Sequence, residues 1–202
     1  MRKQFLLGLV LSLGLINFSS CKKDEPTTPE VILSANQMYK DDWVYFSFET
    51  GAEVSGIDST NYKTSTDWDI AFHSRLGRTN GGTSGNGKGA IYFSGSTNFE
   101  SVTEVNIDNF IQDSTVNLIV GIGNRGPVYK PVSGNVVFDN AFSVDMSQRP
   151  PLYTPQNNVY VIKTANGKYA KIQITGYFDD KGNSGHINFK YAYQTNGSTT
   201  LE

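Results

Sequence analysis

The chain has 202 residues, a formal net charge of −2 and 18% charged residues. Aromatic residues make up 12%, which excludes a disordered chain, a coiled coil and a collagen-like repeat. The length suits one domain, and the absence of a basic stripe argues against nucleic-acid binding.

The first twenty residues have the pattern of an export signal. Two basic residues precede an apolar run from Phe5 to Ile16, which is too short for a comfortable membrane span. Ser19 and Ser20 then precede Cys21, the only cysteine, and this arrangement resembles the lipobox of bacterial lipoproteins. We therefore expect residues 1–20 to be a signal peptide and Cys21 to carry acyl chains such as palmitate, which anchor the protein to a membrane. The alternative is an ordinary secretory signal followed by an unrelated free cysteine.

A tether follows the cysteine. The charged residues 22–25 resemble the export tag of surface lipoproteins in certain Gram-negative anaerobes, which implies display on the outer membrane, although a plain charged linker is the alternative. The proline-containing residues 26–29 favour an extended spacer. We assign residues 21–34 to the lipidated cysteine and flexible tether, and residues 35–202 to the folded domain.

The composition of the rest of the chain favours β-structure. After residue 20 there are 5 leucines against 14 valines and 12 isoleucines, and β-branched residues suit strands better than helices. The strongest strand candidates are residues 43–48, 68–72, 90–93, 116–122, 136–144, 159–164, 168–178 and 186–194. Asn166-Gly167 between two of these runs is a strong hairpin signal, and helix is expected at most over 107–112. The chain therefore predicts a single all-β domain, an antiparallel sandwich or open barrel with little helix.

Few residues carry a recognisable catalytic or metal pattern. His73 and His186 are far apart in sequence and lack the spacing of common zinc motifs, so each is expected on a strand rather than on a metal. Asp67 and Asp69 lie on one face of a predicted strand and could act as acid and base in a hydrolase, but hydrogen bonding to the nearby glycine-rich loop is the plainer interpretation.

Two segments resemble the HmuY family of haem-binding lipoproteins. The first is Ser65 to His73, containing Trp-Asp-Ile-Ala-Phe, with Thr-Asn-Gly-Gly and further glycines over residues 79–89. The second comprises Met146, residues 150–155 and residues 159–173. The resemblance covers roughly residues 35 to 195 and implies an all-β, hand-like domain that binds without catalysis.

The resemblance also implies a cargo and partners. Family members take haem from host haemoproteins and pass it to a TonB-dependent outer-membrane transporter. They hold the haem between two axial side chains, both His or both Met. The residue that matches the first ligand position is Met146, and the alternative for this residue is packing in the core.

The second ligand position departs from both family patterns. It falls in the strand near Ile172 and Gln173, and isoleucine cannot coordinate iron. Three alternatives stay open: five-coordinate haem on Met146, a distant substitute such as His186, or a relative that binds another tetrapyrrole, a glycan or a host protein. Candidate residues of the haem pocket, for stacking or for pairing with propionates, are Tyr129, Arg149, Tyr153, Lys168 and Tyr169.

Overall fold

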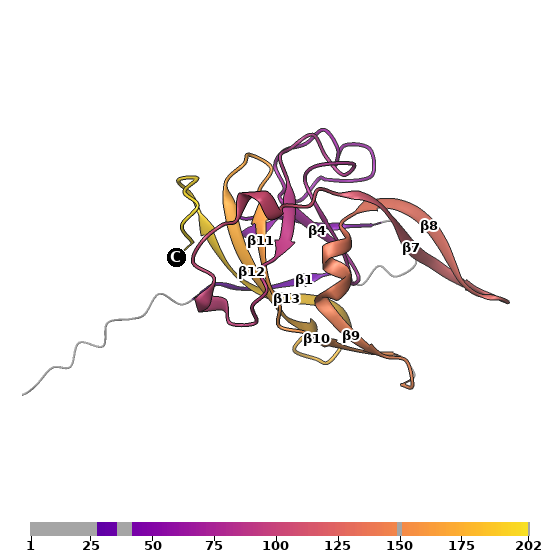
Figure 1. The fold of residues 1–202 in the computed structure, drawn as a ribbon. Coiled ribbons are helices and arrows are strands. Elements are labelled where there is room, and N and C mark those ends of the chain that lie inside the picture. Colours follow the sequence, from indigo (N-terminus) through magenta and orange to yellow (C-terminus); the bar gives the residue numbers. More distant parts are fainter. Residues whose placement is uncertain (1–27, 36–41, 149–150, 202) are drawn as a thin grey trace, which may run out of the picture.

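The regular structure is almost entirely antiparallel β-sheet, as the composition predicts. The computed structural model describes residues 28–35, 42–148 and 151–201. The larger sheet has the strand order β1-β13-β12-β11-β6 (Figure 1). Its strands are β1 (Glu30–Ser34), β6 (Ala90–Phe93), β11 (Val159–Lys163), β12 (Tyr169–Phe178) and β13 (Ser184–Gln194).

A second sheet covers the first through aromatic side chains. Its order is β3-β2-β4-β5, with β2 (Val44–Ser47), β3 (Ala52–Glu53), β4 (Ile70–His73) and β5 (Leu76–Thr79). Phe46 of this sheet meets Phe189 of the larger sheet edge to face, with ring centroids 5.3 Å apart. Because strand residues alternate between faces, one face of each sheet builds a shared apolar core.

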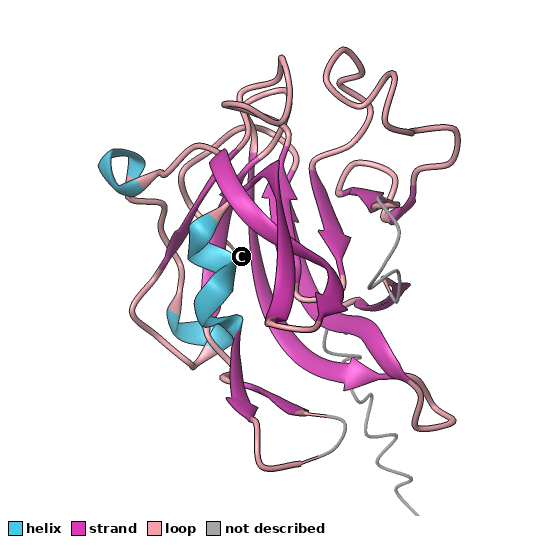
Figure 2. Cartoon of the chain, turned by 90° about the vertical axis from the view of Figure 1, so that its right-hand side faces the viewer, coloured by secondary structure: helices cyan, strands magenta, loops and turns pink. Residues whose placement is uncertain are grey.

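Two hairpins project from the same side of the molecule (Figures 1 and 2). One is formed by β7 (Ser114–Gly123) and β8 (Gly126–Gly134), and the other by β9 (Phe142–Asp145) and β10 (Leu152–Pro155). Each forms its own two-stranded sheet. These hairpins lie outside the two packed sheets and reach beyond them.

The described helical structure consists of short 3₁₀ segments. They are η1 (Phe99–Ser101), η2 (Ile107–Asn109) and η3 (Val136–Ala141). The prediction of helix near residue 107 is thus met by one turn, whereas the predicted strand 136–144 is wrong over its first six residues. Asn135 accepts a hydrogen bond from the Val137 amide and starts η3, and the Phe138 ring fills the space beside Gly77, where a Cβ would collide with it.

The ordered body begins earlier than expected. Residues 30–34, which we assigned to the flexible tether, form β1 and pair along β13, with Leu33 opposite Ile187. Leu33 is buried in the core, and this burial explains why a segment that follows a proline-containing spacer becomes a strand. Within the described residues, no helix is both long and apolar enough to span a bilayer.

Candidate functional site

The segment around Trp68 is part of the scaffold. Trp68 is fully buried, and its indole N–H donates to the Tyr62 carbonyl over 2.9 Å. His73, in the same segment, is also buried and lies 5.6 Å from the Trp43 ring. Among the described residues, no group of three or more His, Cys, Asp or Glu side chains is arranged to hold a metal ion.

The glycine-rich loop is tied down by Asn80. Its amide nitrogen donates to the carbonyls of Ser65 and Trp68, and its amide oxygen accepts from the Gly87 N–H. A Cβ at Gly81 would collide with the backbone of Gly89, so glycine is required where these segments cross. The loop therefore closes on itself and on the segment around Trp68 that precedes β4.

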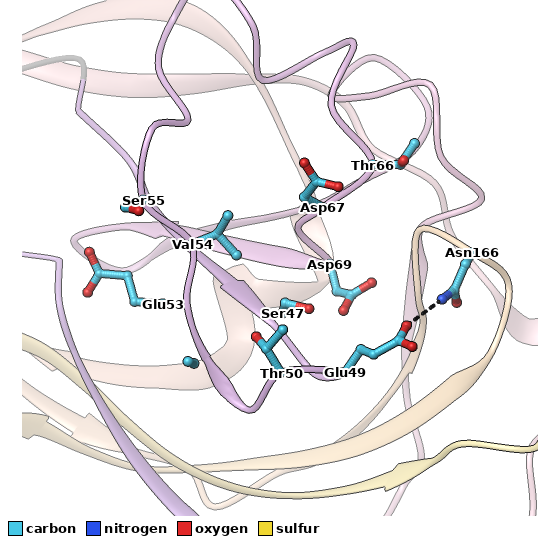
Figure 3. A pocket seen from close by; sticks show the side chains of 11 residues that line it. Ser47, Glu49, Thr50, Glu53, Val54, Ser55, Thr66, Asp67, Asp69 and Asn166 are labelled. Carbon is cyan, nitrogen blue, oxygen red and sulfur yellow. Dashed lines mark hydrogen bonds between the residues drawn. The ribbon is translucent and has the colours of Figure 1, made fainter.

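The carboxyl pair Asp67 and Asp69 lines a cavity of about 580 Å³ (Figure 3). Asp69 is buried, and its two oxygens accept hydrogen bonds from the amides of Phe48 and Ala165 over 2.8 and 2.9 Å. Burial raises the pKa of Asp69, against the lowering effect of these bonds. The Asp69 side chain thus joins two loops, while the expected bond to the glycine-rich loop is made by its backbone carbonyl, which accepts from the Asn80 amide over 3.0 Å.

Large apolar side chains are exposed on the two projecting hairpins. Met146 is 64% exposed and Tyr129 is 57% exposed. Val128, Val144 and Leu152 on the same hairpins are also more than a third exposed. Exposed apolar groups that lie together on a protein surface indicate a contact or ligand surface.

The β9–β10 hairpin is firmly held at its base. The rings of Phe142 and Tyr153 lie 5.3 and 4.9 Å from the ring of Tyr177, which is buried at the end of β12. The Tyr177 hydroxyl lies 2.6 Å from that of Ser74, and burial raises its pKa. Tyr153 therefore supports the hairpin that carries Met146.

Met146 lies in a hydrogen-bonded turn after β9. The Asp145 carboxylate accepts from the amide and the hydroxyl of Ser147 over 2.9 and 2.7 Å. These two bonds span Met146 and lower the pKa of Asp145. The thioether is thus presented to solvent from a short local turn and does not pack in the core.

The two residues at the expected position of the second haem ligand are both engaged in the interior of the protein. Ile172 is fully buried between the sheets, and Gln173 donates to the carbonyls of Thr97 and Asn157 over 2.7 and 2.6 Å. His186 lies at the start of β13, with its Nε2 3.7 Å from a carboxylate oxygen of Asp179. Of these three residues, His186 alone combines a metal-binding atom with partial exposure.

Two expected pocket residues lie far from Met146. Lys168 forms an ion pair with Glu49 over 3.8 Å, and Tyr169 stacks on Phe110, both where β12 begins. The β9–β10 hairpin instead contacts Tyr177, near the end of β12. The ten residues of β12 span about 30 Å. Lys168 and Tyr169 are therefore not brought together with Met146.

Other expected residues lie outside the described part of the chain. These are Cys21 and Arg149. Among the residues that sequence reasoning missed are Val128, Val144 and Leu152, all exposed on the hairpins. Their residue types match those of core strands, so the sequence carried no signal that they face solvent.

Comparison with known proteins agrees with this architecture. The HmuY protein family matches residues 39–191. A structure from Bacteroides vulgatus, described as HmuY-like and heme-binding, is 25% identical with a TM-score of 0.60, and the alignment covers 81% of this chain and 90% of that one. The apo HmuY analog of Tannerella forsythia is 21% identical with a TM-score of 0.65, covering 83% and 96%.

A lipoprotein structure from Bacteroides fragilis is 24% identical with a TM-score of 0.62, covering 80% of this chain and 86% of that one. A search of curated protein sequences gives no match. The family match runs from before β2 to within β13 and includes both projecting hairpins, whereas β1 lies outside it. The chain therefore belongs to the HmuY family.

Proposed function

We propose that this protein is a surface-anchored lipoprotein that captures haem from host haemoproteins and delivers it to a TonB-dependent outer-membrane transporter. Membership of the HmuY family and the likeness to a protein described as heme-binding support haem as the cargo. The likeness to a lipoprotein, together with the sequence around Cys21, supports attachment through an N-terminal lipid. Binding and transfer require no bond to be made or broken in the haem, so the role is not enzymatic.

The observation that carries the proposal is the exposed thioether on an apolar hairpin. Met146 is the only methionine among the residues that the structure describes, and it points away from the core. A solvent-exposed methionine beside Val144 and Leu152 offers both a soft axial ligand and an apolar surface for a porphyrin face. A neutral sulfur ligand favours ferrous over ferric haem.

The remaining affinity has to come from apolar contact and a second group. Val128 and Tyr129 on the β7–β8 hairpin supply further exposed apolar surface. His186 is the described residue that we propose as a distant second ligand; if it does not reach the iron, the haem is five-coordinate on Met146. Each arrangement gives a different absorption spectrum.

Haemin titration of the chain from residue 22 tests the proposal. We expect a Soret shift that is strongest after reduction, and a loss of affinity of roughly tenfold or more in Met146→Ala, since burying a methionine side chain contributes about 1.5 to 3 kcal/mol. Met146→His should restore binding with the spectrum of a nitrogen ligand. Val136→Ala, which truncates an exposed apolar side chain on η3, is the matched control and should bind as wild type. Absence of a shift in both redox states would reject haem as the cargo.

The position of Ile172 favours a second candidate function. Because this side chain lies in the core and cannot coordinate iron, the paired axial ligation of the family cannot form there. A ligand without iron needs no axial side chain, so its affinity would not depend on this position. In that case the same fold binds another tetrapyrrole, a glycan or a host protein. Protoporphyrin IX without metal distinguishes the two: equal affinity for it and for haemin, unchanged by Met146→Ala, would support this alternative.

A further inference from the structure

The cavity that contains Asp67 and Asp69 is separate from the surface that we propose for haem. Its volume of about 580 Å³ falls in the range of small-molecule sites. It is lined by β2, β3, the segments that follow each of them, the segment before β4, and Asn166 (Figure 3). No residue of the β7–β8 or β9–β10 hairpin is among the described residues of its wall. A ligand bound here would therefore be a second one, and it could bind whether or not haem does.

The hydroxyl of Ser47 is a buried polar group in the wall of this cavity. Ser47 is only 5% exposed, and its hydroxyl makes no hydrogen bond with any other described residue. Side chains alternate along a strand and the neighbouring Phe46 packs in the shared core, so Ser47 faces the opposite side of β2, toward the cavity. In Figure 3 its hydroxyl is seen between Thr50 and Asp69. A buried polar group without a partner costs stability, so its presence in a cavity wall indicates a place for a polar ligand.

Carboxylates surround this hydroxyl. The described residues of the cavity wall include no lysine and no arginine, whereas four of them are acidic: Glu49, Glu53, Asp67 and Asp69. The Lys168 ammonium lies 3.8 Å from the Glu49 carboxylate and offsets that charge. The other three acids have no ion-pair partner among the described residues. The cavity therefore carries negative charge that a bound cation would offset.

The remaining wall favours an organic cation over a metal ion. The described acids of the cavity do not form a group that could hold a metal ion, and the space is far larger than a bare ion needs. None of the described lining residues is aromatic, so the wall offers no ring for stacking. Further hydroxyl and amide groups are instead supplied by Thr50, Ser55, Thr66 and Asn166. Such a wall matches a ligand that carries hydroxyl groups as well as a positive charge.

We infer that this cavity binds a small hydroxylated ammonium compound, such as an amino sugar. Each oxygen of Asp69 accepts one amide hydrogen bond, and a carboxylate oxygen can accept two. Asp67 accepts a bond from the Ser65 hydroxyl over 3.2 Å through one oxygen, which leaves its other oxygen for a ligand. An ammonium group donates to these two carboxylates in charge-assisted bonds. The Ser47 hydroxyl then pairs with a hydroxyl group of the ligand.

Calorimetric titration of the chain from residue 22, which contains every described residue, tests this inference. At about pH 6.5 the amine of glucosamine is protonated, and we expect saturable binding. Glucose has nearly the same shape with a hydroxyl in place of the ammonium, and it should bind about tenfold or more weakly because the charge-assisted bonds are lost. Cyclohexylamine keeps the charge on a six-membered ring without hydroxyl groups, and it should also bind more weakly than glucosamine.

Two variants separate the carboxylate from the hydroxyl. Asp67→Asn removes one exposed charge and should weaken glucosamine binding by up to about fivefold. Ser47→Ala should weaken it by about twofold to tenfold without lowering the melting temperature, because this hydroxyl has no partner in the unliganded protein. The matched controls are Asp108→Asn and Ser184→Ala, at exposed positions outside the cavity, and both should bind glucosamine as wild type does.

Four results would overturn the inference. Equal affinity for glucose and glucosamine would contradict the role of charge, and cyclohexylamine binding as tightly as glucosamine would contradict the role of the hydroxyl groups. Calcium ions that bind more tightly than glucosamine and displace it would show a metal site instead. No saturable heat up to about 20 mM glucosamine, roughly the weakest affinity that a built site would show, would reject the cavity as a site for this class of ligand.

Discussion

The buried carboxylate of Asp113 offers the sharpest test of the packing between the hairpins and the sheets. Asp113 is 4% exposed and precedes β7 directly. One oxygen accepts from the Thr79 amide and the Ser84 hydroxyl over 2.9 and 2.6 Å, and the other accepts from the Thr79 hydroxyl and the Asn135 amide over 2.7 and 2.8 Å. Four donors from three segments thus converge on one side chain.

The substitution Asp113→Asn keeps the shape but replaces one acceptor with a donor. In one orientation the new NH₂ faces the Thr79 amide, and in the other it faces the Asn135 NH₂. The two hydroxyl groups can rotate to become acceptors, but those two N–H groups cannot. Asn135 is held further because it also donates to the Ile111 carbonyl. A buried donor left without an acceptor costs about 1 to 3 kcal/mol, so two facing donors should cost about 2 to 4 kcal/mol.

Urea unfolding near pH 7, followed by tryptophan fluorescence, measures this loss. Asp67→Asn makes the same substitution at an exposed carboxylate and should change the free energy of unfolding by less than about 0.5 kcal/mol. If Asp113→Asn does not fold, Ser84→Ala removes one of the four donors and should cost about 1 kcal/mol. A loss in Asp113→Asn no larger than in Asp67→Asn would refute the claim that these bonds join the hairpin to the sheet.

Three further outcomes follow from the packing and the buried charges. Gly77→Ala should lower the free energy of unfolding by about 1 to 3 kcal/mol, since its Cβ would collide with the Phe138 ring, whereas Gly123→Ala has only ordinary contacts and should cost less; urea unfolding compares them. Met146→Ala should leave the melting temperature of the unliganded protein nearly unchanged, because the side chain is mostly exposed; a drop of several degrees would place the sulfur in a packed environment. Burial raises the pKa of Asp69, so the folded protein holds this proton more tightly than the unfolded chain does, and the contribution of Asp69 to stability falls as pH rises from about 4. The advantage of wild type over Asp69→Asn in urea unfolding should therefore shrink between about pH 4 and 7, and an advantage that grows would contradict this sign.

Strand residues were predictable where local pattern and tertiary burial agree. The hairpin around Asn166-Gly167 is an example: Gly167 has a φ of +89°, which glycine adopts without strain. The segment 136–141 is the opposite case, because its β-branched residues favour a strand. The cap at Asn135 and the packing of the Phe138 ring against Gly77 instead produce a 3₁₀ helix. That outcome depends on a contact between Gly77 and Phe138, which are 61 positions apart, and no local pattern contains such a contact.

The candidate site was predictable only in part for a similar reason. Met146 could be identified through its place in a family pattern, but its exposure could not, since methionine occurs both in cores and on binding surfaces. Lys168 and Tyr169 lie close to that pattern in sequence, yet a strand of ten residues carries them away from the hairpin. Sequence proximity within a long strand is thus a poor guide to which residues share a site.

The buried polar residues and the exposed apolar residues of this fold have different roles. Asp69, Asn80 and Asp113 are buried and join distant segments through hydrogen bonds, so replacing any of them should cost stability. Met146 and its apolar neighbours are exposed on the hairpins, whereas Phe142 and Tyr153 anchor the β9–β10 hairpin to the core, so replacing the exposed residues should cost little stability but alter binding. A chain that keeps the buried polar network can therefore fold as a member of its family whatever residue stands at position 172 of the ligand-binding pattern, provided that it fits the core.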